Sequence, residues 1–235
     1  MEERLGQKYL LHLEEESFPL STDSVLLASF VRPGKKMADL GSGCGTLGFL
    51  LCAGSETVTV QGIELSQQAH LRALENIRAN GLEDRLFSLY GDVRSVRELF
   101  PAGSFDAVVS NPPYFPVGSG KVSEKHAAAR SEETLNLRQL CEAAAWLLPT
   151  GGRFFLVHLP GRLCDVLWEL RQAGLEPKRL QWVRHRPGTD CCLFFVEAVR
   201  GGKPGLRYEK DLIEFDEDGQ ATEAYKAAYR IGGTQ

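Results

Sequence analysis

The sequence predicts an α/β fold with a mostly parallel central sheet. Short apolar runs of strand length alternate with amphipathic stretches of helix length along most of the chain. The first core strand runs directly into a glycine-rich turn and then a helix, over residues 37–53. A chain of 235 residues is long enough for one such domain with small additions.

The composition limits the possible classes of protein. Hydrophobic residues make up 43% and charged residues 25% of the chain, which are ordinary values for a globular protein. The formal net charge of −4 argues against a surface that is basic all over, but it permits a local basic face. No apolar stretch approaches the ~20 residues of a membrane span, and the acidic start Met1–Arg4 is unlike a signal peptide. We therefore expect a cytoplasmic protein.

The cysteines give no pattern of metal ligation. They form no C-x-x-C motif, and no pair of histidines has the spacing of metal ligands. We expect buried, reduced thiols and no metal. For the adjacent pair Cys191-Cys192, a role in strand packing is favoured over a redox role. The six cysteines are Cys44, Cys52, Cys141, Cys164, Cys191 and Cys192.

The expected elements follow from apolar periodicity and from helix and turn signals. Strands are expected at 37–40, 57–64, 85–90, 105–110, 153–158, 180–184 and 191–199, with a further strand or arm at 10–13. Helices are expected at 24–31, 47–53, 66–80, 132–148 and 161–173, followed by a hairpin at 211–219 and a short helix near Tyr225 and Tyr229. We divide this single domain into an N-terminal extension (1–35), a core (36–200) and a C-terminal appendage (201–235).

Three of the predicted strands end in residues suited to a nucleoside-containing ligand. The first leads through Asp39 and Leu40 into the turn 41–45, whose glycines permit a tight turn and close approach to a ligand. Glu64 ends the second strand, 23 positions after Gly41, where an acid can accept hydrogen bonds from both ribose hydroxyls. Asp92 follows the third strand and can accept from an adenine amino group. The alternatives are a surface carboxylate for Glu64 and a turn residue for Asp92.

The most informative stretch is Asn111-Pro112-Pro113-Tyr114, directly after the fourth strand. Two prolines remove two amide donors and hold the backbone extended, so carbonyls, one amide side chain and one aromatic ring remain. Such a set suits a flat, nitrogen-bearing group: the amide and a carbonyl accept from an exocyclic amine, and Tyr114 stacks on the ring. The plain alternative is a proline-stiffened loop without chemistry.

Together these motifs resemble S-adenosylmethionine-dependent methyltransferases that modify amino groups, and in particular the bacterial tRNA1(Val) adenine-37 N6-methyltransferase family. The resemblance rests on Asn111–Tyr114, on Asp39–Gly45 and on the earlier pattern Phe18-x-x-Ser21-x-Asp23-x-x-Leu26-Leu27. A looser likeness extends over residues 207–225. It implies a Rossmann-like class I methyltransferase fold, with a seven-stranded, mostly parallel sheet and an antiparallel last strand.

The resemblance also implies roles for individual residues. Asn111, Pro112, Pro113 and Tyr114 would be catalytic. The cofactor S-adenosylmethionine would be bound by Asp23, Asp39, Gly41, Ser42, Gly43, Gly45, Glu64, Leu65, Asp92, Val93 and Asn111. The tRNA substrate would be bound by Tyr114, Phe115, Lys121, Lys125 and Arg130, with further phosphate contacts from Lys178, Arg179, Arg184 and Arg186.

Three other classes remain open at this point. Gly43-x-Gly45-x-x-Gly48 also fits a dinucleotide-dependent oxidoreductase, although that class gives no account of Asn111–Tyr114. Glutamine N5-methyltransferases of release factors share the tetrapeptide but carry an N-terminal helical domain, for which the roughly 35 residues before the first expected strand leave no room. The last alternative is a degenerate fold that serves as a binding scaffold.

Overall fold

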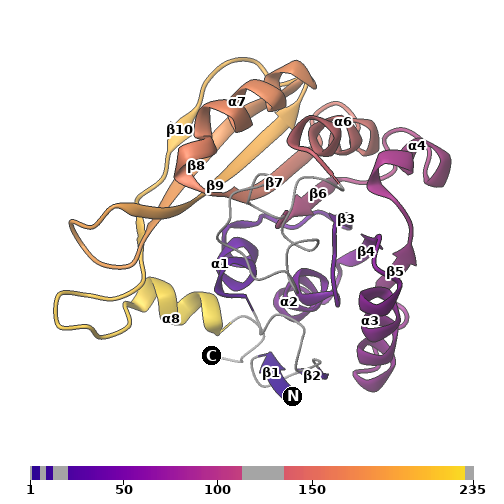
Figure 1. Ribbon diagram of the computed structural model, residues 1–235, viewed down its shortest axis with the longest axis horizontal. Coiled ribbons are helices and arrows are strands. Elements are labelled where there is room, and N and C mark those ends of the chain that lie inside the picture. The colour runs from indigo at the N-terminus through magenta and orange to yellow at the C-terminus, as the bar shows by residue number, and fades with distance from the viewer. Residues whose placement is uncertain (1, 6–8, 13–20, 113–134, 231–235) are drawn as a thin grey trace, which may run out of the picture.

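The computed structural model describes residues 2–5, 9–12, 21–112 and 135–230. Most of its strands form one nine-stranded sheet (Figure 1). They are β3 (Lys36–Leu40), β4 (Thr59–Glu64), β5 (Leu86–Tyr90), β6 (Ala107–Ser110), β7 (Arg153–His158), β8 (Leu175–Arg184), β9 (Cys191–Arg200), β10 (Arg207–Tyr208) and β11 (Leu212–Ile213). A separate antiparallel pair joins β1 (Glu2–Leu5) to β2 (Tyr9–His12).

The order of strands across the large sheet is β10-β8-β9-β7-β6-β3-β4-β5, and β11 pairs with β8 beside β10. Neighbouring strands are parallel except around β9, which is antiparallel to both β7 and β8. The mostly parallel sheet with an antiparallel last core strand is therefore confirmed. Strand β3 lies inside the sheet, between β6 and β4, so the glycine turn that follows β3 does not leave from an edge strand.

Helices cover both faces of the sheet (Figure 1). On one face lie α1 (Thr22–Phe30), α2 (Thr46–Gly54), α3 (Gln67–Ala79) and α8 (Glu223–Tyr229). On the other lie α4 (Val96–Leu99), which follows the 3₁₀ turn η1 (Val93–Ser95), then α6 (Leu137–Leu147) and α7 (Leu163–Gln172), which follows η3 (Pro160–Arg162). Two apolar cores result, one on each side of the sheet.

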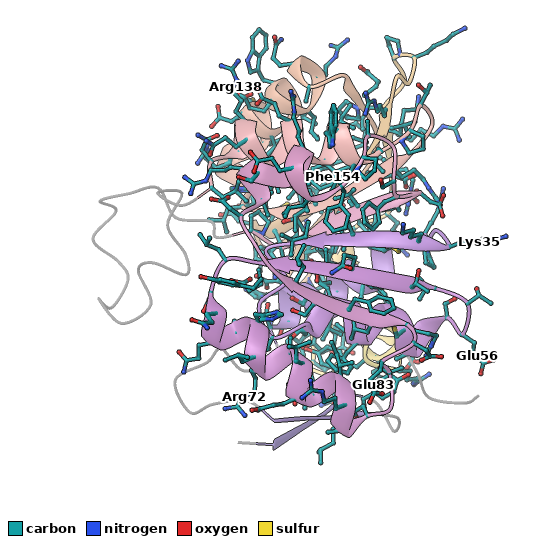
Figure 2. All side chains as sticks on the ribbon, turned by 90° about the vertical axis from the view of Figure 1, so that its right-hand side faces the viewer. Lys35, Glu56, Arg72, Glu83, Arg138 and Phe154 are labelled. Carbon is teal, nitrogen blue, oxygen red and sulfur yellow. The ribbon has the colours of Figure 1, made fainter. Side chains whose placement is uncertain are left out.

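Burial follows this layered arrangement. Phe154 on β7 is fully buried and lies inside the molecule in the side-chain view, whereas Lys35, just before β3, projects from the rim of the sheet (Figure 2). Because successive residues of a strand point to opposite faces, Phe154 enters the core under α6 and α7 while Phe155 enters the core under α1. None of the described helices is long and apolar enough to cross a membrane.

Side-chain caps set the beginnings of several helices. The Ser21 hydroxyl accepts from the backbone N–H of Ser24 and caps the start of α1. Asn136 and Gln139 form a reciprocal capping box that begins α6 at Leu137, five residues later than the sequence predicts. A cap of this kind satisfies amide groups that the first helical turn leaves without partners.

The appendage differs most from the expected structure. Strands β10 and β11 each add in parallel to the edge of β8, through Arg207–Tyr208 and Leu212–Ile213. The hairpin expected at 211–219 is reduced to one isolated antiparallel bridge, between Phe215 and Ala221. Strand β8 itself begins at Leu175 rather than at residue 180, and its pairing with β9 is irregular after Pro177.

Arg179 on β8 joins three parts of the fold. Its guanidinium donates to the nearly buried Glu197 of β9 at 2.5 Å and to Glu209 of the appendage at 2.7 Å. It also lies 4.2 Å from the ring centre of Phe30 on α1. A cation over an aromatic ring that also donates to two carboxylates is well satisfied despite its low exposure. The ion pair therefore connects the last core strand, the appendage and α1.

We predict that Arg179→Ala destabilises the protein by about 3 kcal/mol, because it leaves the Glu197 carboxylate, only 4% exposed, without its cation. Urea unfolding followed by circular dichroism measures the loss. The matched control is Arg171→Ala, which breaks the pair with Glu176 at an arginine that is 59% exposed and should cost less than about 1 kcal/mol. Equal losses for the two variants would contradict the structural role of Arg179.

Candidate functional site

The candidate site lies at the carboxyl ends of three adjacent parallel strands. Strand β3 pairs with β4 on one side and with β6 on the other. The segments that follow them, beginning at Gly41, Leu65 and Asn111, therefore leave the sheet at the same edge. This is where open parallel sheets bind their ligands. The hydroxyl of Ser110 donates to the carbonyl of Leu40 at 2.7 Å and fixes the end of β6 to the end of β3.

The turn after β3 has a backbone that favours glycine. Three of its residues have positive φ angles: Gly41 (74°), Gly43 (56°) and Gly45 (90°). A Cβ atom at Gly41 or Gly43 would meet no described atom within 4 Å, so the strain of such a substitution comes from the backbone and the space beside it is open. The amides of Gly41 and Ser42 both donate to the carbonyl of Ile63, which holds the turn against β4.

Glu64 connects this turn to the start of α3. One carboxylate oxygen accepts from the backbone N–H of Gly43 at 2.7 Å, and the other accepts from the backbone N–H of Ser66 at 2.7 Å. Since a carboxylate has about four acceptor positions, each oxygen can accept one further hydrogen bond. Two adjacent hydroxyl groups of a ligand would fit this arrangement, because the carboxylate is already fixed by backbone donors.

Asp39 is a buried acid without a hydrogen-bond partner among the described residues. It is 1% exposed at the end of β3, and neither carboxylate oxygen has a partner; the same holds for the Ser42 hydroxyl. Burial, with a smaller contribution from the negative charge of Glu64, raises the pKa of Asp39 to about 8. An unsatisfied acid at this depth fits a cationic ligand group, which would supply the missing partner.

Asp92 has a different environment. Its carboxylate accepts from the Arg94 guanidinium at 2.5–3.0 Å and from the Arg94 backbone N–H at 2.8 Å. These hydrogen bonds hold the pKa of Asp92 below its ordinary value. The ionised carboxylate therefore caps η1, and a ligand amine would share it with Arg94. Two apolar residues are also predicted to bind the cofactor. Leu65 is 42% exposed, whereas the side chain of Val93 is buried in the core.

Asn111 is anchored by a residue that sequence analysis did not select. Its side-chain Nδ2 donates to the hydroxyl of Ser24 at 3.0 Å, and Ser24 is only 6% exposed on α1. Because N and O lie on opposite branches of the planar amide, this bond directs the amide oxygen away from Ser24. Ser24 occupies an unspecified position of the early pattern Phe18-x-x-Ser21-x-Asp23-x-x-Leu26-Leu27, directly after Asp23. Pro112 beside Asn111 is buried.

Several predicted residues lie outside the part of the chain that the structure describes. These are Phe18, Pro113, Tyr114, Phe115, Lys121, Lys125 and Arg130. Asp23 is described, and it lies in the first turn of α1, one residue before Ser24.

The predicted phosphate contacts on the late strands are largely engaged elsewhere. Arg179 and Arg184 are paired with carboxylates, Arg184 with Asp211 at 2.6 Å. Lys178 donates to the carbonyl of Lys203. Because carboxylates neutralise both arginines locally, neither offers an unpaired cation for the expected phosphate contact. Arg186, in the turn between β8 and β9, forms no ion pair with any described residue.

The fold is that of a class I methyltransferase. The methyltransferase small domain family matches residues 21–164. The structure is similar to that of a predicted O-methyltransferase from Agrobacterium tumefaciens, with a TM-score of 0.72 and 23% identity, over 89% of this chain and 96% of the other.

The chain belongs to the methyltransferase small domain family and, within it, to the family of tRNA1(Val) (adenine(37)-N6)-methyltransferases. A relative of that name from Tolumonas auensis is 33% identical over 83% of this chain and 77% of its own. Another, from Actinobacillus pleuropneumoniae, is 29% identical over 94% of this chain and 92% of its own. The expected family is confirmed.

We predict that Asp39→Asn stabilises the ligand-free protein, and that the gain depends on pH. Below pH ~4, the ordinary pKa of an aspartate, the carboxyl is protonated in both the folded and the unfolded state, so the gain is small. Between pH ~4 and about 8 only the unfolded wild type loses this proton, so the wild type loses relative stability as the pH rises. Above that window the gain is constant, at up to roughly 5 kcal/mol.

Urea unfolding at several pH values measures this difference. Glu75→Gln is the control, because Glu75 is 60% exposed and the substitution should give no comparable trend. A difference between Asp39→Asn and wild type that stays constant from pH 4 to pH 8 would contradict a raised pKa at Asp39.

Proposed function

We propose that the protein transfers a methyl group from S-adenosylmethionine to the N6 amino group of an adenine in tRNA, at position 37 beside the anticodon. The observation that carries this proposal is the position of Asn111 and Pro112 at the end of β6, directly beside the glycine turn of β3. We infer the substrate, adenine 37 of a tRNA, from the names of the relatives from Tolumonas auensis and Actinobacillus pleuropneumoniae. Since tRNA is the substrate, we place the enzyme in the cytoplasm.

The residues at the edge of the sheet fit this cofactor. Its amino group and sulfonium are positive, and Asp39 is a buried acid without a described partner. Its ribose has two adjacent hydroxyls, and Glu64 has two oxygens fixed by backbone donors. Leu65 follows β4 and Asp92 follows β5, so both would lie beside the adenine ring, whereas the side chain of Val93 is buried in the core. When bound, S-adenosylmethionine supplies an electrophilic methyl group.

Asn111 and Pro112 would act on the target amine. An aromatic amine is a poor nucleophile because its lone pair is delocalised into the ring. Hydrogen bonds from the amine to the Asn111 side-chain oxygen and the Pro112 carbonyl favour a tetrahedral nitrogen and stabilise the positive charge that develops on it. The methylated nitrogen is then acidic and loses its proton to water. Tyr114 and Phe115 would stack on the base and hold it in line.

Ser24 is a positioning residue in this scheme. By accepting from Asn111 Nδ2, it stabilises the orientation of the amide in which the oxygen remains available to the substrate. The constraint is rigid, because Ser24 is buried on a helix whose neighbours Val25 and Leu26 belong to the core. A fixed acceptor costs no reorganisation when the amine arrives.

We predict that Asn111→Ala lowers kcat by on the order of 10²-fold and leaves the affinity for S-adenosylmethionine nearly unchanged. Ser24→Ala should lower kcat by about tenfold, the effect of losing one orienting hydrogen bond. The control is Ser29→Ala on the same helix, where the hydroxyl donates only to the carbonyl of Leu26. Single-turnover kinetics measures the rate of methyl transfer, and calorimetry measures the affinity for S-adenosylmethionine. An Asn111→Ala enzyme with wild-type turnover would exclude the assigned role.

The substrate is tested with an unmodified valine tRNA transcript, radiolabelled S-adenosylmethionine and the full-length enzyme. We expect N6-methyladenosine in the wild-type transcript and none in a transcript with guanine at position 37. Duplex DNA and a release factor are incubated in parallel, because adenine and glutamine methyltransferases share the tetrapeptide. Methylglutamine in the release factor, with unlabelled tRNA, would replace this proposal by protein methylation.

A further inference from the structure

Three side chains with metal-binding donors meet where the C-terminal appendage crosses the end of the β8–β9 hairpin. They are His185, just after β8, Cys192 on β9 and Glu214, just after β11. One nitrogen, one sulfur and one carboxylate oxygen, respectively, lie within 4.8 Å of one another. Sequence analysis predicted no metal, because these residues come from three separate segments and show none of the usual ligand spacings.

Backbone hydrogen bonds hold the segments of His185 and Glu214 together without any ligand. The N–H of Glu214 donates to the carbonyl of Arg184 at 2.9 Å, and the N–H of Phe215 donates to the carbonyl of His185 at 3.0 Å. The carbonyl of Glu214 accepts in turn from the N–H of Thr222 at 2.9 Å. The donor atoms of His185 and Glu214 are thus brought together by the sheet, so little ordering would be needed on metal binding.

A β-bulge determines the position of Cys192. Val183 pairs with Leu193 and Arg184 pairs with Cys191, so Cys192 is the extra residue on β9. A bulge bends its strand and redirects a side chain. Here the half-buried sulfur of Cys192 lies within reach of His185 and Glu214, and its thiol donates to the carbonyl of Val183 at 3.4 Å.

The surroundings suit a cation with one open coordination position. Glu214 is only 5% exposed, so its carboxylate is mostly withdrawn from water, and its side chain accepts from His185 Nδ1 at 2.6 Å. The imidazole is 67% exposed, which leaves a path for an ion to enter. A thiolate, an imidazole and a carboxylate together match Zn²⁺, which binds such ligands at about 2.0–2.3 Å and completes a tetrahedron with water.

We propose that His185, Cys192 and Glu214 bind one Zn²⁺ ion that fastens the C-terminal appendage to the β8–β9 hairpin. The ion replaces the hydrogen bond between His185 and Glu214 and the hydrogen bond from the Cys192 thiol, whose proton passes to the solvent. Tetrahedral ligands stand roughly 3.3–3.8 Å apart, which rotation of the exposed imidazole and the carboxylate can reach. This proposal does not rest on the proposed methyl transfer.

Cobalt(II) tests the site directly, because a thiolate ligand gives a charge-transfer band in the near ultraviolet and tetrahedral coordination gives strong visible bands. The full chain is used in a Cys164→Ser background, which removes the exposed thiol. We expect both sets of bands to saturate at one equivalent and to disappear in Cys192→Ser. Cys191→Ser is the matched control, since it alters the adjacent, equally half-buried cysteine and should keep the bands.

Thermal unfolding gives a second readout that does not depend on activity. Zinc at about a hundredfold excess over its Kd should raise Tm by roughly 5–10 °C in the background protein and in Cys191→Ser. His185→Ala and Glu214→Gln, checked for folding by circular dichroism, should show no such rise. Absence of cobalt bands in the background protein, or equal binding by Cys192→Ser, would overturn the proposal.

Discussion

The parallel pairing of β3 with β4 and β6 is the constraint on which the site depends. It places the ends of three strands side by side, although the residues that follow them are about 20 to 70 positions apart in the sequence. Each strand end contributes a different chemical group: the glycine turn from β3, the carboxylate of Glu64 from β4 and the amide of Asn111 from β6. No single segment contains the site, so the register of the sheet decides whether these groups meet.

The two acids at this edge of the sheet have opposite effects on the stability of the ligand-free protein. Glu64 is satisfied by two backbone donors, so it stabilises the turn whether or not a ligand is bound. Asp39 has no described partner and is buried, so it destabilises the ligand-free fold by the free energy needed to keep its proton. A cationic ligand group would pair with the ionised carboxylate and offset this destabilisation. A role in ligand binding therefore accounts for an acid that is unfavourable for folding alone.

Those parts of the fold and site that depend on local signals could be predicted from the sequence. The strand, glycine turn and helix around Gly41–Gly45 form one continuous motif, and Glu64 follows at a characteristic distance. Ser24 could not be predicted, because its partner Asn111 is 87 positions away and a serine inside an apolar helix has no distinctive pattern. The parallel addition of β10 and β11 was also missed, since two-residue strands on an edge lack periodicity.

Helix α1 connects the site to the appendage. Ser24 near its start holds Asn111, and Phe30 at its end lies under Arg179, which binds Glu209 of the appendage. Its first residue, Thr22, contacts the hydroxyl of Tyr229 on α8 at 3.1 Å. The Asn111 amide is therefore positioned by a helix that Tyr229 of the appendage contacts at its first residue, and that is linked to Glu209 at its other end through Arg179 of β8. A change that releases the appendage should alter catalysis through the orientation of Asn111, even though no described residue of the appendage has a predicted role at the reacting atoms.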